Sequence, residues 1–389
     1  MKRFAARARG RRLRTRLQWA HDEVVLPEGP HKNKHFREHF QPYTGAMLRL
    51  MDHSPLRNFR FSGCVQSGKS FLGVICVLWH LFERGEDVGY AVPELDQSGS
   101  DKWQKEFLPV IQASPRLRRL LPDTGSGSQG GTPKSITFKN GATLRFISGT
   151  GGDHHRSNFT VPVVFMTEVD RYDKSGQSSR ETSPPNQIIN RTASFKGRAF
   201  TYEECTVTEL DGRIWLELQE STNHKPYVKC CHCGLHVSPT REDFHGVDDA
   251  KTLDEAEANG CFRCSLCGEA WTDKQRWDML AEMILVGEGQ KLTIGSDGEG
   301  LLEGKLKATD RLGFSWNAYF NRFWSTKEIA KDEWNALYSR NPEDKDLERR
   351  QHAWTLPAEP SIFTLTPITL RDIVDRCSKA DTLEKLPLG

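Results

Sequence analysis

Residues 63–70 have the residue types and spacing of a phosphate-binding loop. Their sequence, Gly-Cys-Val-Gln-Ser-Gly-Lys-Ser, fits the pattern G-x-x-x-x-G-K-[ST] at every specified position. Glycines let the backbone wrap closely around a polyphosphate, and the amide N–H groups of such a loop point inward at phosphate oxygens. We expect Lys69 to reach the β- and γ-phosphates and Ser70 to bind Mg²⁺. The residues expected to contact a bound ATP are Gly63, Gln66, Ser67, Gly68, Lys69 and Ser70.

The segments on either side of this loop supply the context that it needs. Residues 58–61 are typical of a short strand, and apolar residues recur at helical spacing between Phe71 and Arg84. A helix that starts in the loop adds the positive end of its dipole to the phosphate site. The alternative, a chance match in an ordinary turn, does not explain these flanks.

Hydrolysis also needs a carboxylate that orients or deprotonates water. Val161–Met166 is a continuous apolar run, as expected of a buried parallel strand, and Thr167 and Glu168 follow it directly. Glu168 is our candidate for the water-activating group, and the alternative is an exposed acid at a strand end. An aspartate that holds Mg²⁺ through water usually precedes such a glutamate. Because Thr167 has no charge, we expect weaker metal binding unless Glu168 or Asp170 compensates.

Arg156 is a second catalytic candidate. It lies upstream of Glu168 in a loop rich in glycine and histidine. An arginine there could point at the γ-phosphate of a neighbouring subunit and stabilise transition-state charge. A solvated loop arginine is the simpler alternative.

Six of the ten cysteines lie between Cys230 and Cys267, which favours a metal site over a disulfide framework. Two Cys-x-x-Cys knuckles, each followed by glycine, predict a structural four-thiolate Zn²⁺ site with the ligands Cys230, Cys233, Cys264 and Cys267. Cys231 and Cys261 are left over from this set. Several alternatives stay open: pairing of Cys261 with Cys264, substitution by His232 or His236, or a lost or degenerate site of buried thiols.

The remaining pattern places these residues on an α/β fold. The expected helices lie at 44–52, at 101–121 with a break at Pro115, at 274–285, and at 325–338 with Ser325 or Thr326 as cap. We expect a strand at 88–92 and a hairpin at 135–147 around Asn140-Gly141. The other segments are a Gly/Ser-rich loop at 123–132, a Gly-rich turn region near 287–300 and an aromatic-rich segment at 312–324. Strands that alternate with helices around a phosphate loop predict a doubly wound, mostly parallel sheet.

Composition predicts a soluble globular protein without a transmembrane helix, and it shows one charge asymmetry. The chain is 37% hydrophobic and 27% charged, with a net charge of +2 and no long apolar run. Eight lysines and arginines and no acids lie within residues 2–16. No apolar core follows them, so they are not a secretory signal. We expect residues 1–30 to form a basic flexible arm, either a solvated tail or a segment that binds nucleic acid or an acidic partner.

Several motifs together resemble one family. They are Gln41-Pro42-Tyr43, Gln66 to Ser70, Glu168 to Tyr172, Thr206 to Gly212, Tyr227 to Gly234 and Phe314 to Ala336. Over residues 35–360 the chain resembles the large terminase subunit of tailed phages, in its lambda-like branch. That family packages DNA into proheads. The sequence departs from the family pattern at Thr167, at Cys205 and at Val207.

The resemblance implies a P-loop packaging ATPase over residues 31–360, with a zinc-knuckle insertion at 225–285. It implies ATP, Mg²⁺ and structural Zn²⁺ as bound groups, with Gln41 on the adenine side and with Thr206 and Thr208 sensing the γ-phosphate. The implied partners are double-stranded DNA, the small terminase subunit, the portal and prohead, and further copies of the chain in a ring. No membrane is implied, and the expected location is the host cytoplasm.

The family also has a nuclease domain, and residues 361–389 resemble the linker towards it. We therefore expect ATPase but not nuclease activity. Two rival functions stay open: a helicase-like DNA-dependent ATPase, and a zinc-stabilised packaging scaffold whose nucleotide site is weak or dead, which Thr167 favours.

Overall fold

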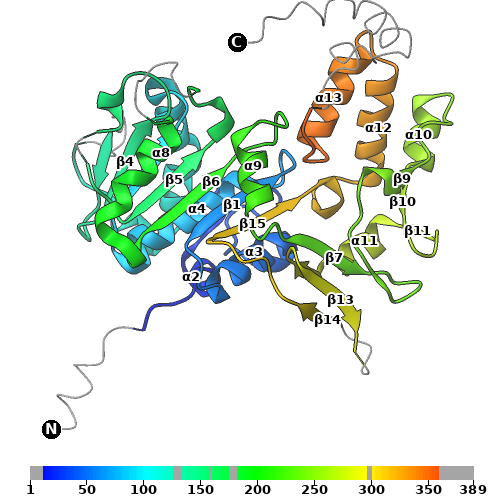
Figure 1. Ribbon diagram of the computed structural model, residues 1–389, viewed down its shortest axis with the longest axis horizontal. Helices are drawn as coiled ribbons and strands as arrows, with labels where there is room; N and C mark the ends of the chain where they lie inside the picture. The colour runs from blue at the N-terminus through cyan, green and yellow to red at the C-terminus, as the bar shows by residue number, and fades with distance from the viewer. Residues whose placement is uncertain (1–11, 126–133, 158, 175–181, 296–299, 359–389) are drawn as a thin grey trace, which may run out of the picture.

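The computed structural model describes residues 12–125, 134–157, 159–174, 182–295 and 300–358. In these residues a seven-stranded sheet has the order β15-β1-β6-β5-β2-β4-β3, and only β3 runs antiparallel to its neighbour (Figure 1). Its strands are β15 (Arg311–Trp316), β1 (Asn58–Gly63), β6 (Phe200–Glu204), β5 (Val163–Thr167), β2 (Val88–Val92), β4 (Thr143–Ser148) and β3 (Ser135–Thr137). The predicted mixed α/β sheet is confirmed, including the strand at 88–92 and the hairpin of β3 and β4.

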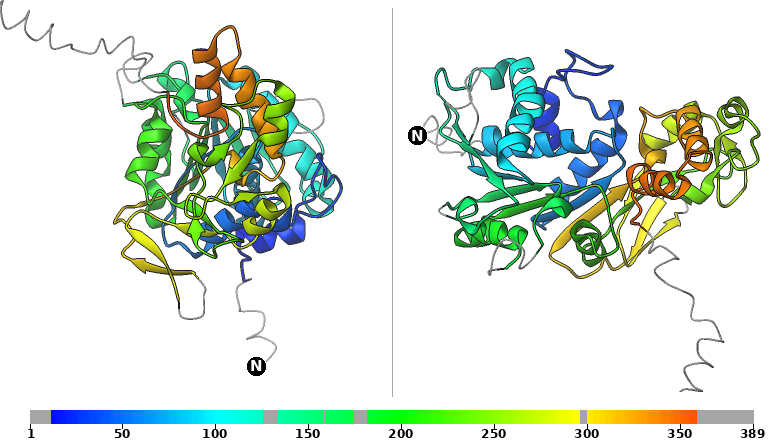
Figure 2. Two further views of the ribbon diagram at one scale, coloured as in Figure 1. Left: turned by 90° about the vertical axis from the view of Figure 1, so that its right-hand side faces the viewer. Right: turned by 90° about the horizontal axis from the view of Figure 1, so that it is seen from above.

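Helices cover both faces of this sheet. Side chains on a strand alternate between the two faces, and here both faces are apolar, so each needs a helical layer to bury it. On β5, Val163 and Phe165 belong to the larger cluster, whereas Val164 and Met166 belong to the smaller one. The helices around the sheet are α2 (Arg16–Glu23), α3 (Pro42–His53), α4 (Lys69–Trp79), α5 (Ser100–Lys102), α6 (Leu108–Ala113), α7 (Pro115–Arg118), α8 (Pro184–Ile189) and α9 (Arg213–Glu220). Ile188 of α8 and Ile214 of α9 lie in the smaller cluster, and Figure 2 shows the two helical layers.

The segment after α9 builds a second, smaller unit beside the β15 edge of the sheet (Figure 1). Its strands are β7 (Lys225–Lys229), β8 (His236–Val237), β9 (Phe244–His245), β10 (Cys261–Arg263), β11 (Ala270–Trp271), β12 (Ile284–Val286), β13 (Gln290–Ile294) and β14 (Gly300–Gly304), and its helices are α10 (Leu253–Asn259), α11 (Asp273–Leu280), α12 (Thr326–Leu337) and α13 (Pro342–His352). The predicted cap of α12 is confirmed, because the side chain of Ser325 and that of Glu328 form a reciprocal capping box.

The segment near 287–300 differs from the predicted turn region, because it contains β13 and the start of β14, which pair as an antiparallel ribbon. The glycines lie at the ends of the ribbon, where Gly289 and Gly304 have φ values of 87° and 89°. Glycine content alone therefore misled the prediction, since it marks where the strands stop.

The flexible arm predicted for residues 1–30 is wrong for its described part, residues 12–30. Trp19 on α2 is buried in the main core. Arg14 Nη2 lies 2.7 Å from Glu83 Oε2, and Arg16 Nη1 lies 2.9 Å from Asp52 Oδ1. These acids pair with Arg14 and Arg16 but are remote in sequence, so composition alone indicated a flexible arm, either solvated or bound to a partner.

Residues 1–11, and the linker predicted at 361–389, lie outside the described residues. Within the described part of the chain, no helix is long and apolar enough to cross a bilayer.

Candidate active site

The phosphate loop connects β1 to α4, as predicted from the flanking pattern. β1 ends at Gly63 and α4 begins at Lys69. Between them Gln66 and Gly68 adopt left-handed conformations, with φ of 54° and 84°. Since α4 begins inside the loop, its unbonded N–H groups and the positive end of its dipole are available to an anion.

The side of the loop away from this helix packs against Trp316 at the end of β15. The Trp316 indole Nε1 donates to Ser67 Oγ at 2.9 Å, and Ser67 Oγ donates to the Cys64 carbonyl at 2.5 Å. A Cβ on Gly63 would lie 2.1 Å from the indole ring, so only glycine fits there. The Ser67 side chain is fully buried and fixes the loop; its predicted contact with the nucleotide stays a prediction.

A pocket of about 550 Å³ opens at the carboxyl ends of the strands and brings most of the predicted residues together. Those that line it are Gln66, Gly68, Lys69, Ser70, Glu168, Thr206 and Thr208. Lys69 and Glu168 therefore lie on the same side of the sheet, as one catalytic site requires. Lys102, Arg171, Glu204, Gln351 and His352 also line the pocket, and none was a sequence candidate.

Glu168 has a backbone conformation that non-glycine residues rarely adopt, with φ at 55°. Its side chain is about one-third exposed, its Oε2 accepts a 2.7 Å hydrogen bond from Arg171 Nη1, and its Oε1 lies 3.9 Å from Lys102 Nζ. Strained residues of this kind concentrate at functional sites because the surrounding structure must hold them. The left-handed turn directs the chain away from β5 and leaves the carboxylate facing the pocket.

Glu204, at the end of β6, is the nearest carboxylate to the loop lysine. Its Oε2 lies 3.0 Å from Lys69 Nζ, and its Oε1 accepts a hydrogen bond from Thr167 Oγ1. Burial alone would raise the pKa of Glu204, but the charges of Lys69 and Lys102 outweigh it and hold the pKa below its ordinary value. No sequence pattern indicated this residue, since its strand was not predicted.

Thr206 and Thr208 follow β6 and connect the pocket to other elements. Thr206 Oγ1 accepts from Lys69 Nζ at 3.1 Å. Thr208 Oγ1 donates to Asp170 Oδ2 at 2.7 Å, and Asp170 Oδ1 accepts from Ile214 N at the start of α9. Asp170 thus caps α9 and does not point at the phosphate loop.

Gln41 lies beside a second pocket, of about 340 Å³, on the other side of Gly68 and Ser70. Its Nε2 donates to Asn321 Oδ1 at 3.1 Å, and its Oε1 accepts from Arg322 N at 3.1 Å. The lining is mostly apolar and includes Leu26, His31, Phe36, Phe40, Phe71 and Val110. An apolar pocket that shares two loop residues with the phosphate pocket suits a flat aromatic base.

Arg156 matches neither expectation from the sequence. Its side chain is fully buried. Its Nε donates to Gln187 Oε1 at 2.9 Å, and its Nη atoms donate to the carbonyls of Thr150 (3.2 Å) and Gly151 (2.7 Å). A solvated arginine and a finger for a neighbouring subunit would both need an exposed guanidinium, whereas this one holds the loop after β4.

Comparison with known families decides the assignment. Residues 31–284 match the model of the family described as "Phage terminase large subunit gpA, ATPase domain". The chain belongs to this family.

Solved structures similar to this terminase chain include large terminases of several phages. They are the ATPase domain from Thermus phage P74-26 (11% identity, TM-score 0.42, covering 79% of this chain and 91% of that one), the HK97 bacteriophage large terminase (11%, 0.40, 54% and 41%) and the large terminase of a thermophilic bacteriophage (17%, 0.31, 42% and 38%). A comparison with curated proteins found no match. The assignment rests on the family match.

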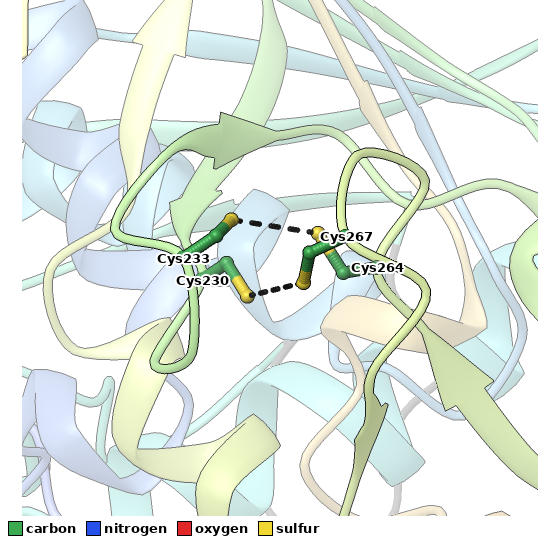
Figure 3. Close-up of side chains that lie close together, drawn as sticks. All are labelled: Cys230, Cys233, Cys264 and Cys267. Atoms are coloured by element: carbon green, nitrogen blue, oxygen red, sulfur yellow. Dashed lines mark hydrogen bonds between the residues drawn. The ribbon is translucent and has the colours of Figure 1, made fainter.

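The terminase chain also gathers the four predicted knuckle cysteines (Figure 3). Their four Sγ atoms all lie within 4.8 Å of one another, and they belong to Cys230, Cys233, Cys264 and Cys267. The two knuckles have the same local structure: Gly234 N donates to Cys230 O and Gly268 N to Cys264 O, and both glycines have positive φ. Cys231 is exposed and Cys261 half-buried, and neither belongs to this group. Four converging thiols on two such turns are a donor set that fits tetrahedral Zn²⁺.

Proposed function

We propose that this terminase chain is the ATP-hydrolysing motor that translocates double-stranded DNA into proheads. The observation that supports it most is the shared pocket of Lys69, Ser70 and Glu168 at the end of a parallel sheet. A phosphate ligand, a metal-binding hydroxyl and a carboxylate for water are the minimum set for hydrolysis of a nucleoside triphosphate.

In this proposal ATP spans the two pockets that meet at Gly68 and Ser70. The adenine lies in the apolar pocket beside Gln41, and the phosphates lie on the loop backbone and Lys69. The Ser70 hydroxyl lies in the phosphate pocket, and an oxygen ligand of this kind suits Mg²⁺. When bound, Mg²⁺ supplies positive charge that neutralises the triphosphate.

Glu168 orients and deprotonates the attacking water, and Lys69 stabilises charge on the phosphate being released. Thr206 already contacts Lys69, so it is placed to sense loss of the γ-phosphate. Thr208 transmits the change, because its hydroxyl bonds Asp170 at α9 and its carbonyl accepts a 2.6 Å hydrogen bond from Gln351 Nε2 on α13.

The partners follow from the family. We propose that the motor acts in the host cytoplasm with duplex DNA, the small terminase subunit, the portal and prohead, and further copies in a ring. DNA contacts to phosphates would make its affinity independent of sequence and sensitive to salt. We further propose that Zn²⁺ on the four cysteines is structural, since a closed four-thiolate site leaves no position open for chemistry.

The test is ATP hydrolysis by the purified chain with duplex DNA and proheads. We expect Lys69→Ala to abolish hydrolysis and ATP binding, and Lys331→Ala, on the exposed face of α12, to change neither. ATP binding without turnover under all these conditions would favour the scaffold function that Thr167 suggested. DNA-dependent turnover with strand separation would favour a helicase.

A further inference from the structure

The order of the sheet places β6 between the phosphate-loop strand and the strand of Glu168. Phe61 on β1 is in register with Glu204 on β6, and Glu204 is in register with Thr167 on β5. The end of β6 therefore lies between Lys69 and the place where an aspartate usually holds the metal. A side chain at position 204 can reach both.

Glu204 does reach both. One of its oxygens accepts the Thr167 hydroxyl, and the other lies 3.0 Å from Lys69 Nζ. The side chain is 2% exposed and lines the phosphate pocket together with Ser70. Its Oε2 makes the ion pair with Lys69 and accepts no hydrogen bond from any other described residue, so a lone pair of this oxygen remains for another donor.

Two other acids were the sequence candidates for replacing the missing aspartate, and both are committed elsewhere. Both oxygens of Asp170 accept hydrogen bonds, from Thr208 Oγ1 and from Ile214 N. Glu168 accepts a hydrogen bond from Arg171, and the proposed function assigns its carboxylate to the attacking water. Burial of an ionised carboxylate as deep as that of Glu204 is costly unless a cation stays beside it. Lys69 is the cation in direct contact here, and Lys102 contributes its charge from farther away. ATP would draw Lys69 towards its phosphates, and the carboxylate would then lose its direct positive partner.

We propose that Glu204 replaces the aspartate absent at position 167, and that it holds nucleotide-bound Mg²⁺ through water from β6 instead of β5. The inference rests on the proposed function, because it assumes that Mg²⁺–ATP binds at residues 63–70. Thr167 becomes a positioning residue, since its hydroxyl fixes the orientation of the Glu204 carboxylate.

The experiment measures how strongly Mg²⁺ increases the affinity for a fluorescent, non-hydrolysable ATP analogue, by titration in Mg²⁺ and in EDTA. We expect wild-type protein to bind the analogue more tightly with Mg²⁺. Glu204→Gln keeps the size and the Thr167 contact but lacks the charge, so it should lose most of that gain, about tenfold or more. Its affinity in EDTA should be unchanged or higher, because a negative charge near the phosphates is gone. Electron paramagnetic resonance of Mn²⁺ bound with the analogue gives a second readout.

Glu203→Gln is the matched control. Glu203 is the preceding residue of β6, is equally buried, and pairs with Arg60 and Arg213 away from the pocket. This variant should lose stability but keep the full effect of Mg²⁺. In Thr167→Asp/Glu204→Gln the carboxylate returns to β5, so this double variant should recover the effect. If Glu204→Gln alone does not fold, the double variant provides the test. A folded double variant whose affinity for the analogue does not increase with Mg²⁺ contradicts the proposal.

Two negative results have different meanings. If the wild-type chain does not bind the analogue with Mg²⁺, the proposed function fails. If the wild-type chain binds it and Glu204→Gln retains the entire effect of Mg²⁺, only this inference fails, and Glu204 is merely the counter-ion of Lys69.

Discussion

At the scale of single residues, the site combines groups that sequence could identify with groups that it could not. Lys69, Ser70 and Glu168 belong to local motifs whose spacing carries the chemistry. Glu204 and Lys102 approach them only through the tertiary fold, from a strand end and a short helix. Arg156 shows the converse, because a reactive residue type in a suggestive loop proved to be an internal support.

The structural role of Arg156 predicts a loss of stability. Arg156→Ala would leave the carbonyls of Thr150 and Gly151 without their donors, so we expect a loss on the order of 3 kcal/mol of unfolding free energy. Chemical denaturation measures it. Arg119→Ala, at an exposed position, is the control and should have little effect. Unchanged stability of Arg156→Ala, combined with loss of hydrolysis, would restore its role as an arginine finger.

His80 predicts a dependence of stability on acid. Burial lowers the pKa of His80 from 6.5 to about 4, although its 2.8 Å hydrogen bond with Glu86 opposes this. Between those values the unfolded chain binds more protons than the folded one, so stability falls as pH falls. This group contributes a loss on the order of 3 kcal/mol between pH 7 and pH 4.

Glu86 adds to the acid effect below that range. The pKa of Glu86 is lowered from 4.5 to about 2 despite burial, through its hydrogen bonds with His80 and Arg84. Its contribution is therefore present above pH 4.5 and is lost towards pH 2. Urea denaturation at several pH values should give a shallower decline for His80→Gln between pH 6.5 and pH 4. An identical decline in that variant would assign the effect to other groups.

At the scale of elements, the sequence predicted the strands, turns and caps that depend on residues close together in the chain. The phosphate-loop strand, β2, β5, the β3–β4 hairpin and the cap of α12 all have short-range patterns. β6 and β15 were missed because neither has such a pattern: β6 ends in two acids, and β15 follows the long knuckle segment. The docking of α2 was missed because its basic residues find acids that are remote in sequence, such as Asp52 and Glu83.

The cluster of Cys230, Cys233, Cys264 and Cys267 predicts a requirement for metal. Cys230→Ser should reduce zinc from about one ion per chain to almost none and lower the melting temperature, since thiolates are the preferred ligands. Metal analysis by mass spectrometry measures it. Cys231→Ser changes an exposed neighbour outside the cluster and should keep its zinc. Equal loss in both variants would favour one of the alternative ligand sets, and a wild-type chain without zinc would contradict the site.

At the scale of the whole molecule, a series of contacts runs from the segment around the four knuckle cysteines to the phosphate loop. Phe262 packs edge-on against Tyr319 near the knuckles and lies 6.1 Å from the Trp354 ring. The His352 carbonyl then accepts a 2.8 Å hydrogen bond from Val65 N in the phosphate loop. Sequence could not reveal these contacts, because their residues come from segments that become neighbours only when β15 pairs with β1 at the edge of the sheet.

The most direct test of the central claim is single-turnover phosphate release by Glu168→Gln, with duplex DNA and proheads present. The side chain keeps its size but cannot accept a proton. We predict that ATP binding stays as in the wild-type chain and that the rate of release falls by about 100-fold or more. Phosphate release by Glu168→Gln at the wild-type rate would contradict the account, since the pocket shared by Lys69 and Glu168 would then not be where ATP is split.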